Sequence, residues 1–245
     1  MKFILNSIFL SGIFAVQSAS AALTVAWSED FNSYTTPGTD LNGVSTATGT
    51  GTFDTTSGVV ANGSGGVTLT ADTNRQQLAI ENATAALAGR FTFDITHDVV
   101  PDPATNNSIF LQMTEGGRST GSNEVADFAY TLNGGAVGTT PVTFNIFFNV
   151  TGADFAYTAP DNTMQTLVTG AYDVWIDNTR TTTASSDTNA MGGLPVNGVK
   201  TLFLQTFNGQ EGNVYTFDNM SFSVPEPGSA LLGMIGGLLL LRRRR

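Results

Sequence analysis

The feature that most constrains this fold is a series of short segments in which apolar and polar residues alternate. Residues 90–96 show it cleanly, because Phe91, Phe93 and Ile95 fall on one face of an extended chain. A period of two, bounded by Gly, Asn, Asp and Pro clusters, is typical of β-strands with one buried face. Such patterns or β-rich composition predict ten strands, at Leu23–Trp27, Gly66–Thr70, Gln77–Ile80, Arg90–His97, Ser108–Met113, Val125–Leu132, Val142–Val150, Gly170–Ile176, Val199–Phe207 and Val214–Val224.

The last predicted strand repeats the pattern with one interruption. Tyr215, Phe217 and Phe222 are expected to face the core, while Asp218-Asn219 breaks the alternation between them. Only Ala83–Ala88 looks helical, and no long amphipathic helix is available to cover a parallel sheet. We therefore expect an all-β fold, a two-sheet antiparallel jelly-roll sandwich.

The predicted sandwich is one domain, residues 22–223, with long polar loops at Asn32–Gly51 and Asn178–Val199. Residues 22–241 hold five basic and twenty acidic side chains, a formal charge of −15. That charge repels phosphate backbones, so nucleic acid is not an expected partner. The chain has no cysteine, which excludes thiol catalysis, thiolate metal sites and redox chemistry.

The N-terminus predicts a signal peptide, residues 1–21. Lys2 precedes an apolar stretch, Phe3–Val16, and the small residues Ala19-Ser20-Ala21 follow it. This order of charge, apolar run and Ala-x-Ala is the pattern that signal peptidase cleaves. The alternative, a buried first helix or strand, does not explain that order.

The C-terminal segment, residues 224–245, has three features in a fixed order. Pro225-Glu226-Pro227 precedes an apolar run, Ala230–Leu241, and the chain finishes with Arg242, Arg243, Arg244 and Arg245. The prolines end the last strand, and the apolar run is short for a span, which normally needs about 20 residues. Four arginines favour retention on the cytoplasmic side of a membrane.

This tail resembles the PEP-CTERM sorting signal of Gram-negative bacteria. The resemblance implies recognition by exosortase, a transient inner-membrane tether through the short helix, and delivery to the cell surface or beyond. Proteins with this signal commonly accompany exopolysaccharide production. The alternative is an ordinary C-terminal membrane anchor, which also places the domain outside the cytoplasm.

Three segments of the predicted domain resemble parts of concanavalin-like (laminin-G-like) jelly rolls. They are Glu29–Tyr34 at the start, Ala171–Asp177 in the middle and Phe217–Phe222 at the end. In such domains an aspartate-phenylalanine pair opens the first strand and an aspartate-asparagine pair marks the last. The resemblance implies the same architecture here.

Catalytic chemistry is not expected. The single histidine, His97, falls at a strand end, and no nucleophile turn or phosphate-binding loop is present. Glycoside hydrolases need two carboxylates close together. The nearest pairs are Glu124 with Asp127, on opposite strand faces, and Asp173 with Asp177, which share a face but read as solvated turn residues.

A structural calcium ion is a possible cofactor. Hard cations bind several carboxylate and carbonyl oxygens. Because jelly rolls often place their first and last strands side by side, Glu29 or Asp30 is predicted to meet Asp218 and Asn219. The alternative is that Asp30 and Asp218 accept bonds from turn amides or face solvent.

Sugar binding would need exposed aromatic rings, and Trp175 and Tyr172 are the candidates that we select, ahead of Tyr157, Tyr130 and Tyr34. The alternative is that these rings face the core. The sequence thus favours an exported, non-catalytic cell-surface or matrix protein. The other readings are a module that binds exopolysaccharide and, less favoured, a glycoside hydrolase.

Overall fold

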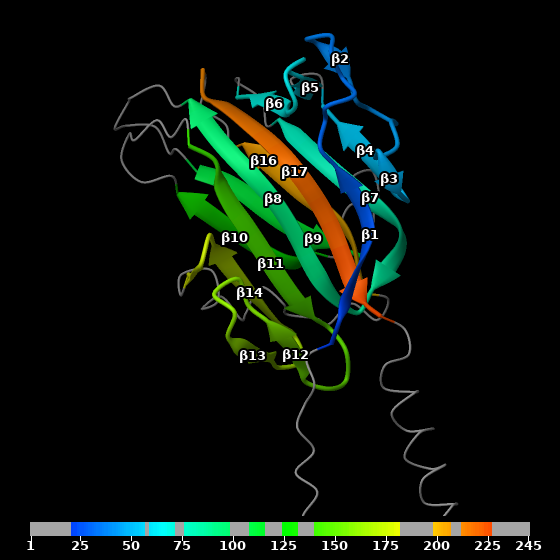
Figure 1. The fold of residues 1–245 in the computed structure, drawn as a ribbon. Coiled ribbons are helices and arrows are strands. Elements are labelled where there is room, and N and C mark those ends of the chain that lie inside the picture. The colour runs from blue at the N-terminus through cyan, green and yellow to red at the C-terminus, as the bar shows by residue number, and fades with distance from the viewer. Residues whose placement is uncertain are drawn as a thin grey trace, which may run out of the picture.

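A computed structural model of the chain describes residues 21–56, 59–71, 76–98, 108–115, 124–131, 140–181, 198–206 and 212–226. These residues form two antiparallel sheets packed face to face and one additional hairpin (Figure 1). The predicted all-β antiparallel fold is confirmed, and the arrangement is consistent with a jelly-roll sandwich. The predicted signal helix and the predicted apolar tail lie outside the described residues.

The larger sheet has ten strands in the order β15-β14-β11-β8-β17-β6-β5-β2, with β1 beside the second half of β17 and β3 beside β1. Its strands are β1 (Leu23–Glu29), β2 (Thr39–Asp40), β3 (Thr48–Gly49), β5 (Val59–Ala61), β6 (Val67–Thr70), β8 (Ala88–Asp98), β11 (Val142–Asn149), β14 (Ala171–Ile176), β15 (Thr179–Arg180) and β17 (Val214–Pro225).

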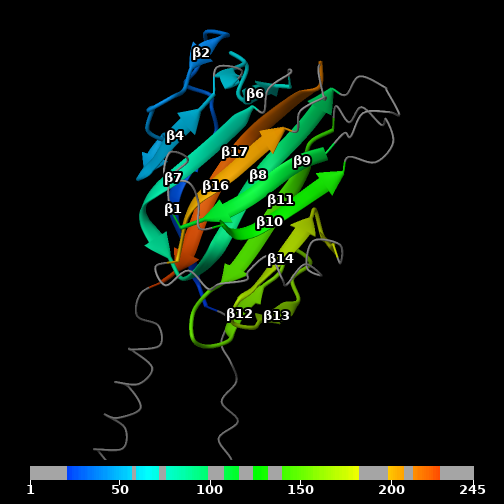
Figure 2. The same ribbon diagram turned by 180° about the vertical axis from the view of Figure 1, so that it is seen from behind.

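The smaller sheet has the order β10-β9-β16-β7-β4 and lies in front in Figure 2. Its strands are β4 (Gly51–Thr55), β7 (Gln77–Ala86), β9 (Ser108–Thr114), β10 (Glu124–Thr131) and β16 (Val199–Thr206). A separate hairpin, β12 (Phe155–Thr158) and β13 (Met164–Leu167), packs on the outer face of the larger sheet, over β11 and β14.

Alternation along the central strands places phenylalanine between the sheets. Phe91 stacks on Phe222 with ring centroids 4.4 Å apart, and Phe93 stacks on Phe144 at 5.1 Å. All four rings are fully buried. Stacked aromatic pairs add to the free energy of burial, so these ring contacts help to hold strands β8, β11 and β17 together.

The predicted interruption in the last strand is a β-bulge. The register of β17 against β8 shifts between Asp218 and Ser221, and Asn219 has a φ of 49°. The extra residue restores the phase of the alternation, so that Tyr215, Phe217 and Phe222 are all buried.

All ten predicted strands are present, but the predicted helix at Ala83–Ala88 is wrong. These residues complete β7, turn at Leu87 and begin β8, because the alanines extend a strand that pairs with β16. Tertiary pairing outweighs the helix propensity of alanine here. The predicted loop Asn32–Gly51 contains two short strands, β2 and β3. The described part of the chain holds no helix with the length and apolarity that a bilayer crossing requires.

The two ends of the described domain lie together. Leu23, at the start of β1, pairs with Pro225, the last residue of β17. The backbone N–H of Glu226 donates to the carbonyl oxygen of Ala22 at 2.9 Å. β1 therefore begins, and β17 ends, at the same end of the sandwich, which is the lower end of the coloured domain in Figure 1.

Candidate functional site

The described part of the predicted sorting motif continues directly from the sheet. Pro225 is half-buried within β17, and Glu226 is exposed just after it. The hydroxyl of Thr24 donates to Oε1 of Glu226 at 3.2 Å. The acidic side chain of the motif is therefore presented at the surface, next to the first strand.

The remaining sorting and cleavage residues are described only in part. Ala21 is half-buried, and its N–H donates to the carbonyl oxygen of Ala156 in β12 at 3.1 Å. Ala19, Pro227 and the terminal arginines Arg242–Arg245 lie outside the described residues.

A second candidate site surrounds the β17 bulge. A hollow of about 290 Å³ is lined by Ser28, Asp30, Thr48 and Asn219, among others. A neighbouring hollow of about 170 Å³ shares Asn219 with it and is lined by residues including Asp94, Thr216 and Asp218. The bulge thus brings acidic and amide side chains from β8, β17 and the end of β1 to one region.

The electrostatics of this region is dominated by negative charge. Burial raises the pKa of Asp218, and the carboxylates of Asp94 and Asp30 raise it further. A hydrogen bond from the backbone N–H of Asn219 acts in the opposite direction and lowers this pKa. Asp94 is held by two donors, the Thr143 hydroxyl at 2.6 Å and the Asn219 side-chain amide at 2.8 Å. A bound cation would relieve the repulsion among these three carboxylates.

Glu29 also lines the first hollow, but its carboxylate is already engaged by backbone amides. It is buried, and its carboxylate accepts the backbone N–H of Phe31 at 2.7 Å and that of Ala47 at 2.6 Å. Asp30 remains exposed, and one of its oxygens accepts the N–H of Asn32. Among the described residues, no group of three or more acidic, His or Cys side chains has the arrangement of a metal site. Calcium therefore stays a prediction.

The two aromatic residues selected for sugar binding are buried. Trp175 is 3% exposed beneath the β12–β13 hairpin, and Tyr172 is 4% exposed and packs in the core between the sheets. Neither ring presents a face to a ligand, so we do not retain them as sugar-binding residues. The sequence reasoning missed the hairpin because its strands have only four residues each.

Beneath the hairpin lies a buried polar network. The indole N–H of Trp175 donates to the Tyr157 hydroxyl at 3.1 Å, and that hydroxyl donates to the Asp173 carboxylate at 2.6 Å. Arg180 forms an ion pair with the other oxygen of Asp173. Burial, and then the bond to Asp173, raises the pKa of Tyr157. The network joins the hairpin to β14 and β15.

Of the two carboxylate pairs considered for glycoside hydrolysis, the structure describes the side chains of only one. Asp173 is buried in the network, whereas Asp177 adopts a φ of 51° and accepts the N–H of Thr143. The expectation that Asp173 is a solvated turn residue is wrong, because the hairpin covers it. The side chains of Glu124 and Asp127 lie outside the described residues.

The outer face of the larger sheet carries a row of hydrogen-bonding side chains. Ser28 pairs with Ser221, Ser221 with Thr92, and Thr92 with Asn145, which forms one row across four strands. Ser28, Ser221 and Thr92 are half-buried, whereas Asn145 is buried, at 7% exposure. The Thr92 hydroxyl donates to Asn145 at 3.1 Å. No charged residue interrupts this row.

Several solved structures are similar to the chain at TM-scores below 0.5. The catalytic domain of an endo-1,3-beta-glucanase (laminarinase) from Thermotoga petrophila RKU-1 has a TM-score of 0.46 and 9% identity over 84% of this chain and 99% of that one. The Emp47p carbohydrate recognition domain has a TM-score of 0.44 and 10% identity, over 83% of this chain and 97% of that one. Lectin II from Ulex europaeus has a TM-score of 0.44 and 11% identity, over 82% of this chain and 100% of that one.

These neighbours are jelly rolls of the concanavalin-like and legume-lectin type. At these TM-scores and identities the likeness carries neither a family nor a function for this chain. No family model matches the chain. No curated protein matches its sequence.

Proposed function

We infer that this chain is an exported, non-catalytic cell-surface or matrix protein of a Gram-negative bacterium. Signal peptidase removes residues 1–21, and exosortase reads the tail at Pro225-Glu226-Pro227. The tail holds the precursor in the inner membrane before the protein is released or attached outside. The sequence order of motif, apolar run and arginines is the basis of this proposal.

One observation of the fold supports it most. The N–H of Glu226 is bonded to Ala22, the first residue after the predicted signal cleavage. The two predicted processing sites therefore adjoin the folded domain at one end, and the described part of the motif includes an exposed glutamate. This arrangement lets a folded domain remain intact while enzymes act on both terminal segments.

The test is intact mass and cell fractionation of the protein from its native host. Wild-type protein is expected to lack residues 1–21 and the tail, while the Pro225→Ala/Glu226→Ala/Pro227→Ala variant keeps its tail in the inner membrane. Thr24→Ala is the matched control, because it removes the bond to Glu226 and leaves the motif intact. Equal processing of wild type and the triple variant would overturn the sorting assignment.

A second candidate function is binding of exopolysaccharide through the half-buried side chains Ser28, Ser221 and Thr92 of this row. Hydroxyl side chains on the face of a sheet can bond to sugar hydroxyls, and no charged residue interrupts the row. Ser221→Tyr places a bulky ring at this half-buried position on the outer face. Retention of the protein on immobilised host polysaccharide is expected to fall in this variant, and unchanged retention would exclude the row.

A further inference from the structure

The exposed apolar side chains of the domain gather at one end. Four large hydrophobic residues are between 47% and 57% exposed: Val25, Leu87, Met164 and Val168. We call them the terminal patch. No other large hydrophobic residue of the described segments is exposed. Single exposed apolar residues are ordinary on a protein surface, but four confined to one end need an explanation.

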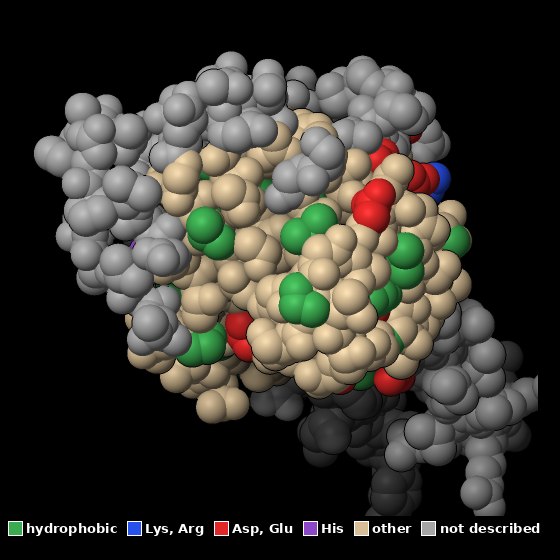
Figure 3. Space-filling view, turned by 90° about the horizontal axis from the view of Figure 1, so that it is seen from above, with side chains coloured by type: hydrophobic (Ala, Val, Ile, Leu, Met, Phe, Trp, Pro, Cys, Tyr) green, Lys and Arg blue, Asp and Glu red, His purple; other side chains and the backbone are tan. Residues whose placement is uncertain are grey.

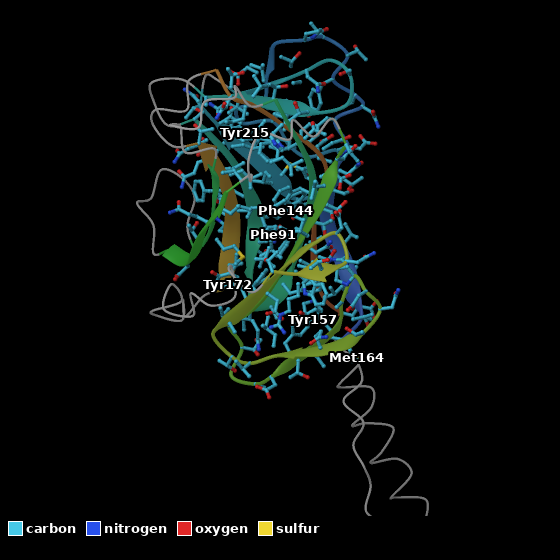
Figure 4. All side chains as sticks on the ribbon, turned by 90° about the vertical axis from the view of Figure 1, so that its left-hand side faces the viewer. Phe91, Phe144, Tyr157, Met164, Tyr172 and Tyr215 are labelled. Carbon is cyan, nitrogen blue, oxygen red and sulfur yellow. The ribbon has the colours of Figure 1, made fainter. Side chains whose placement is uncertain are left out.

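Backbone contacts place the patch beside the chain ends. Leu87 accepts a bond from the N–H of Val150, and Val168 accepts one from Ala171, so both flank the end of β11. Met164 is the first residue of β13, which pairs with β12. The carbonyl oxygen of Ala156 in β12 accepts the N–H of Ala21, next to the start of the described domain. Figure 4 shows Met164 at the opposite end of the molecule from Tyr215.

A hollow adjoins the patch. It has a volume of about 510 Å³ and is lined by apolar residues that include Ala26, Leu87 and Val224, together with the polar residues Thr50, Asn82, Thr84 and Thr151. The far end of the domain, seen in Figure 3, has mainly uncharged polar side chains with separate apolar and acidic spots. What distinguishes the near end is that it carries the exposed large hydrophobic side chains of the described segments.

The chain itself limits what this end can face. Four peptide steps separate Glu226 from Ala230, where the apolar run of the tail begins. A fully extended chain covers about 14 Å in four steps. If the apolar run enters a bilayer, Glu226 is held within that distance of the point of entry, so the end of the sandwich that carries the terminal patch is the end nearest the membrane.

We propose that the terminal patch is a docking surface for a lipid bilayer, which seats the folded domain on the membrane that holds its tail. The proposal rests on the tethering step of the proposed function. Three exposed carboxylates lie in segments that join the patch strands or the chain end: Asp154 just before β12, Asp161 between β12 and β13, and Glu226 just after β17. Their negative charge repels anionic headgroups, so an apolar contact at this end favours zwitterionic over anionic lipid. The tether makes a weak contact effective, because it raises the local concentration of lipid.

The absence of cysteine allows a direct test with single labels. Leu87→Cys and Val168→Cys are each labelled with an environment-sensitive fluorophore, and Ser64→Cys, exposed in the β5–β6 turn, is the matched control. The tail-bearing protein from a host without exosortase is reconstituted into phosphatidylcholine vesicles that contain a lipid quencher near the headgroups. Quenching at residues 87 and 168 is expected to exceed that at residue 64 by at least about twofold.

The outcomes separate the docking surface from the tether. Protein that floats with the vesicles but shows equal quenching at all three positions is tethered and not seated, which overturns the docking surface alone. Protein that does not float with the vesicles overturns both proposals. A concentration-dependent blue shift at residue 87 without lipid assigns the patch to a second copy of the chain and also overturns the proposal. Replacing part of the lipid with phosphatidylglycerol is expected to reduce the quenching.

Discussion

The two faces of the ten-stranded sheet are built from the same strands but are stabilised differently. The inner face is apolar, with Phe91, Phe93 and Phe144 packed against the smaller sheet. The outer face is polar, and the β12–β13 hairpin covers only part of it. The comparison shows that alternation determines which side chains face outward, while the cover determines whether those side chains are buried.

The covered and open parts of the outer face also differ. Under the hairpin, Asp173 is neutralised by Arg180 and bonded to Tyr157. In the open part, Asp94 and Asp218 lie opposite each other without a described cationic partner. The covered part is a stabilising network, whereas in the open part no ion pair among the described residues compensates the negative charge.

The largest effect is expected on the inner face. Phe91→Ala removes a ring that stacks on Phe222 and contacts Phe148. The cavity and the lost burial are expected to lower the free energy of unfolding by about 3–5 kcal/mol. Urea unfolding measures it, with Thr96→Ala on the outer face as the control, expected to cost below about 1 kcal/mol. Similar losses for both variants would contradict the contrast between the faces.

Loss of the covered network is expected to lower the free energy of unfolding by less than loss of Phe91. Asp173→Ala leaves the Tyr157 hydroxyl buried without its acceptor, while Arg180 is 43% exposed and can return to water. The expected loss is about 1–3 kcal/mol. Tyr157→Phe, which keeps the stacking on Phe147, is expected to cost about 1 kcal/mol.

A local readout distinguishes this network from the main core. The chain has two tryptophans, so a Trp27→Phe background leaves Trp175 as the reporter beneath the hairpin. A red shift of its emission in Asp173→Ala, before global unfolding, is the expected sign that the hairpin has loosened. Emission unchanged up to the global transition would mean that apolar packing alone holds the hairpin.

The sequence predicted the inner face well and the cover poorly, for a physical reason. The alternation that points Phe91, Phe93 and Ile95 inward can be seen within a few consecutive residues. The same is true of the interruption at Asp218-Asn219, where the structure has the bulge. The burial of Trp175 depends instead on the short strands β12 and β13, which carry little pattern of their own. The ion pair between Asp173 and Arg180 likewise arises from strand pairing, which composition does not reveal.

The open part of the outer face is predicted to respond to calcium. A cation bound by Asp30, Asp218 and Asn219 would stabilise the folded state by about 1.4 kcal/mol at ten times its dissociation constant. Thermal unfolding in millimolar calcium and in chelator measures this. Asp30→Asn is the control and is expected to abolish the increase. An increase that survives this substitution would place the ion elsewhere.

The smallest effect is expected from Asp218→Asn in the absence of calcium. Folding raises the pKa of Asp218, so the folded protein binds the proton of the Asp218 carboxyl more tightly than the unfolded chain does. This contribution to stability is present below the unfolded pKa of about 3.9 and is lost as the pH rises through the folded pKa. In Asp218→Asn, the amide oxygen still accepts the Asn219 N–H, and the repulsion from Asp94 and Asp30 is removed.

The variant should therefore be more stable than wild type at pH 7, by less than about 1 kcal/mol, with the advantage disappearing below about pH 4. Urea unfolding across that range measures it. A variant less stable than wild type at pH 7 would show that the bond from Asn219 to a charged acceptor outweighs the repulsion, and the open face would then resemble the covered one.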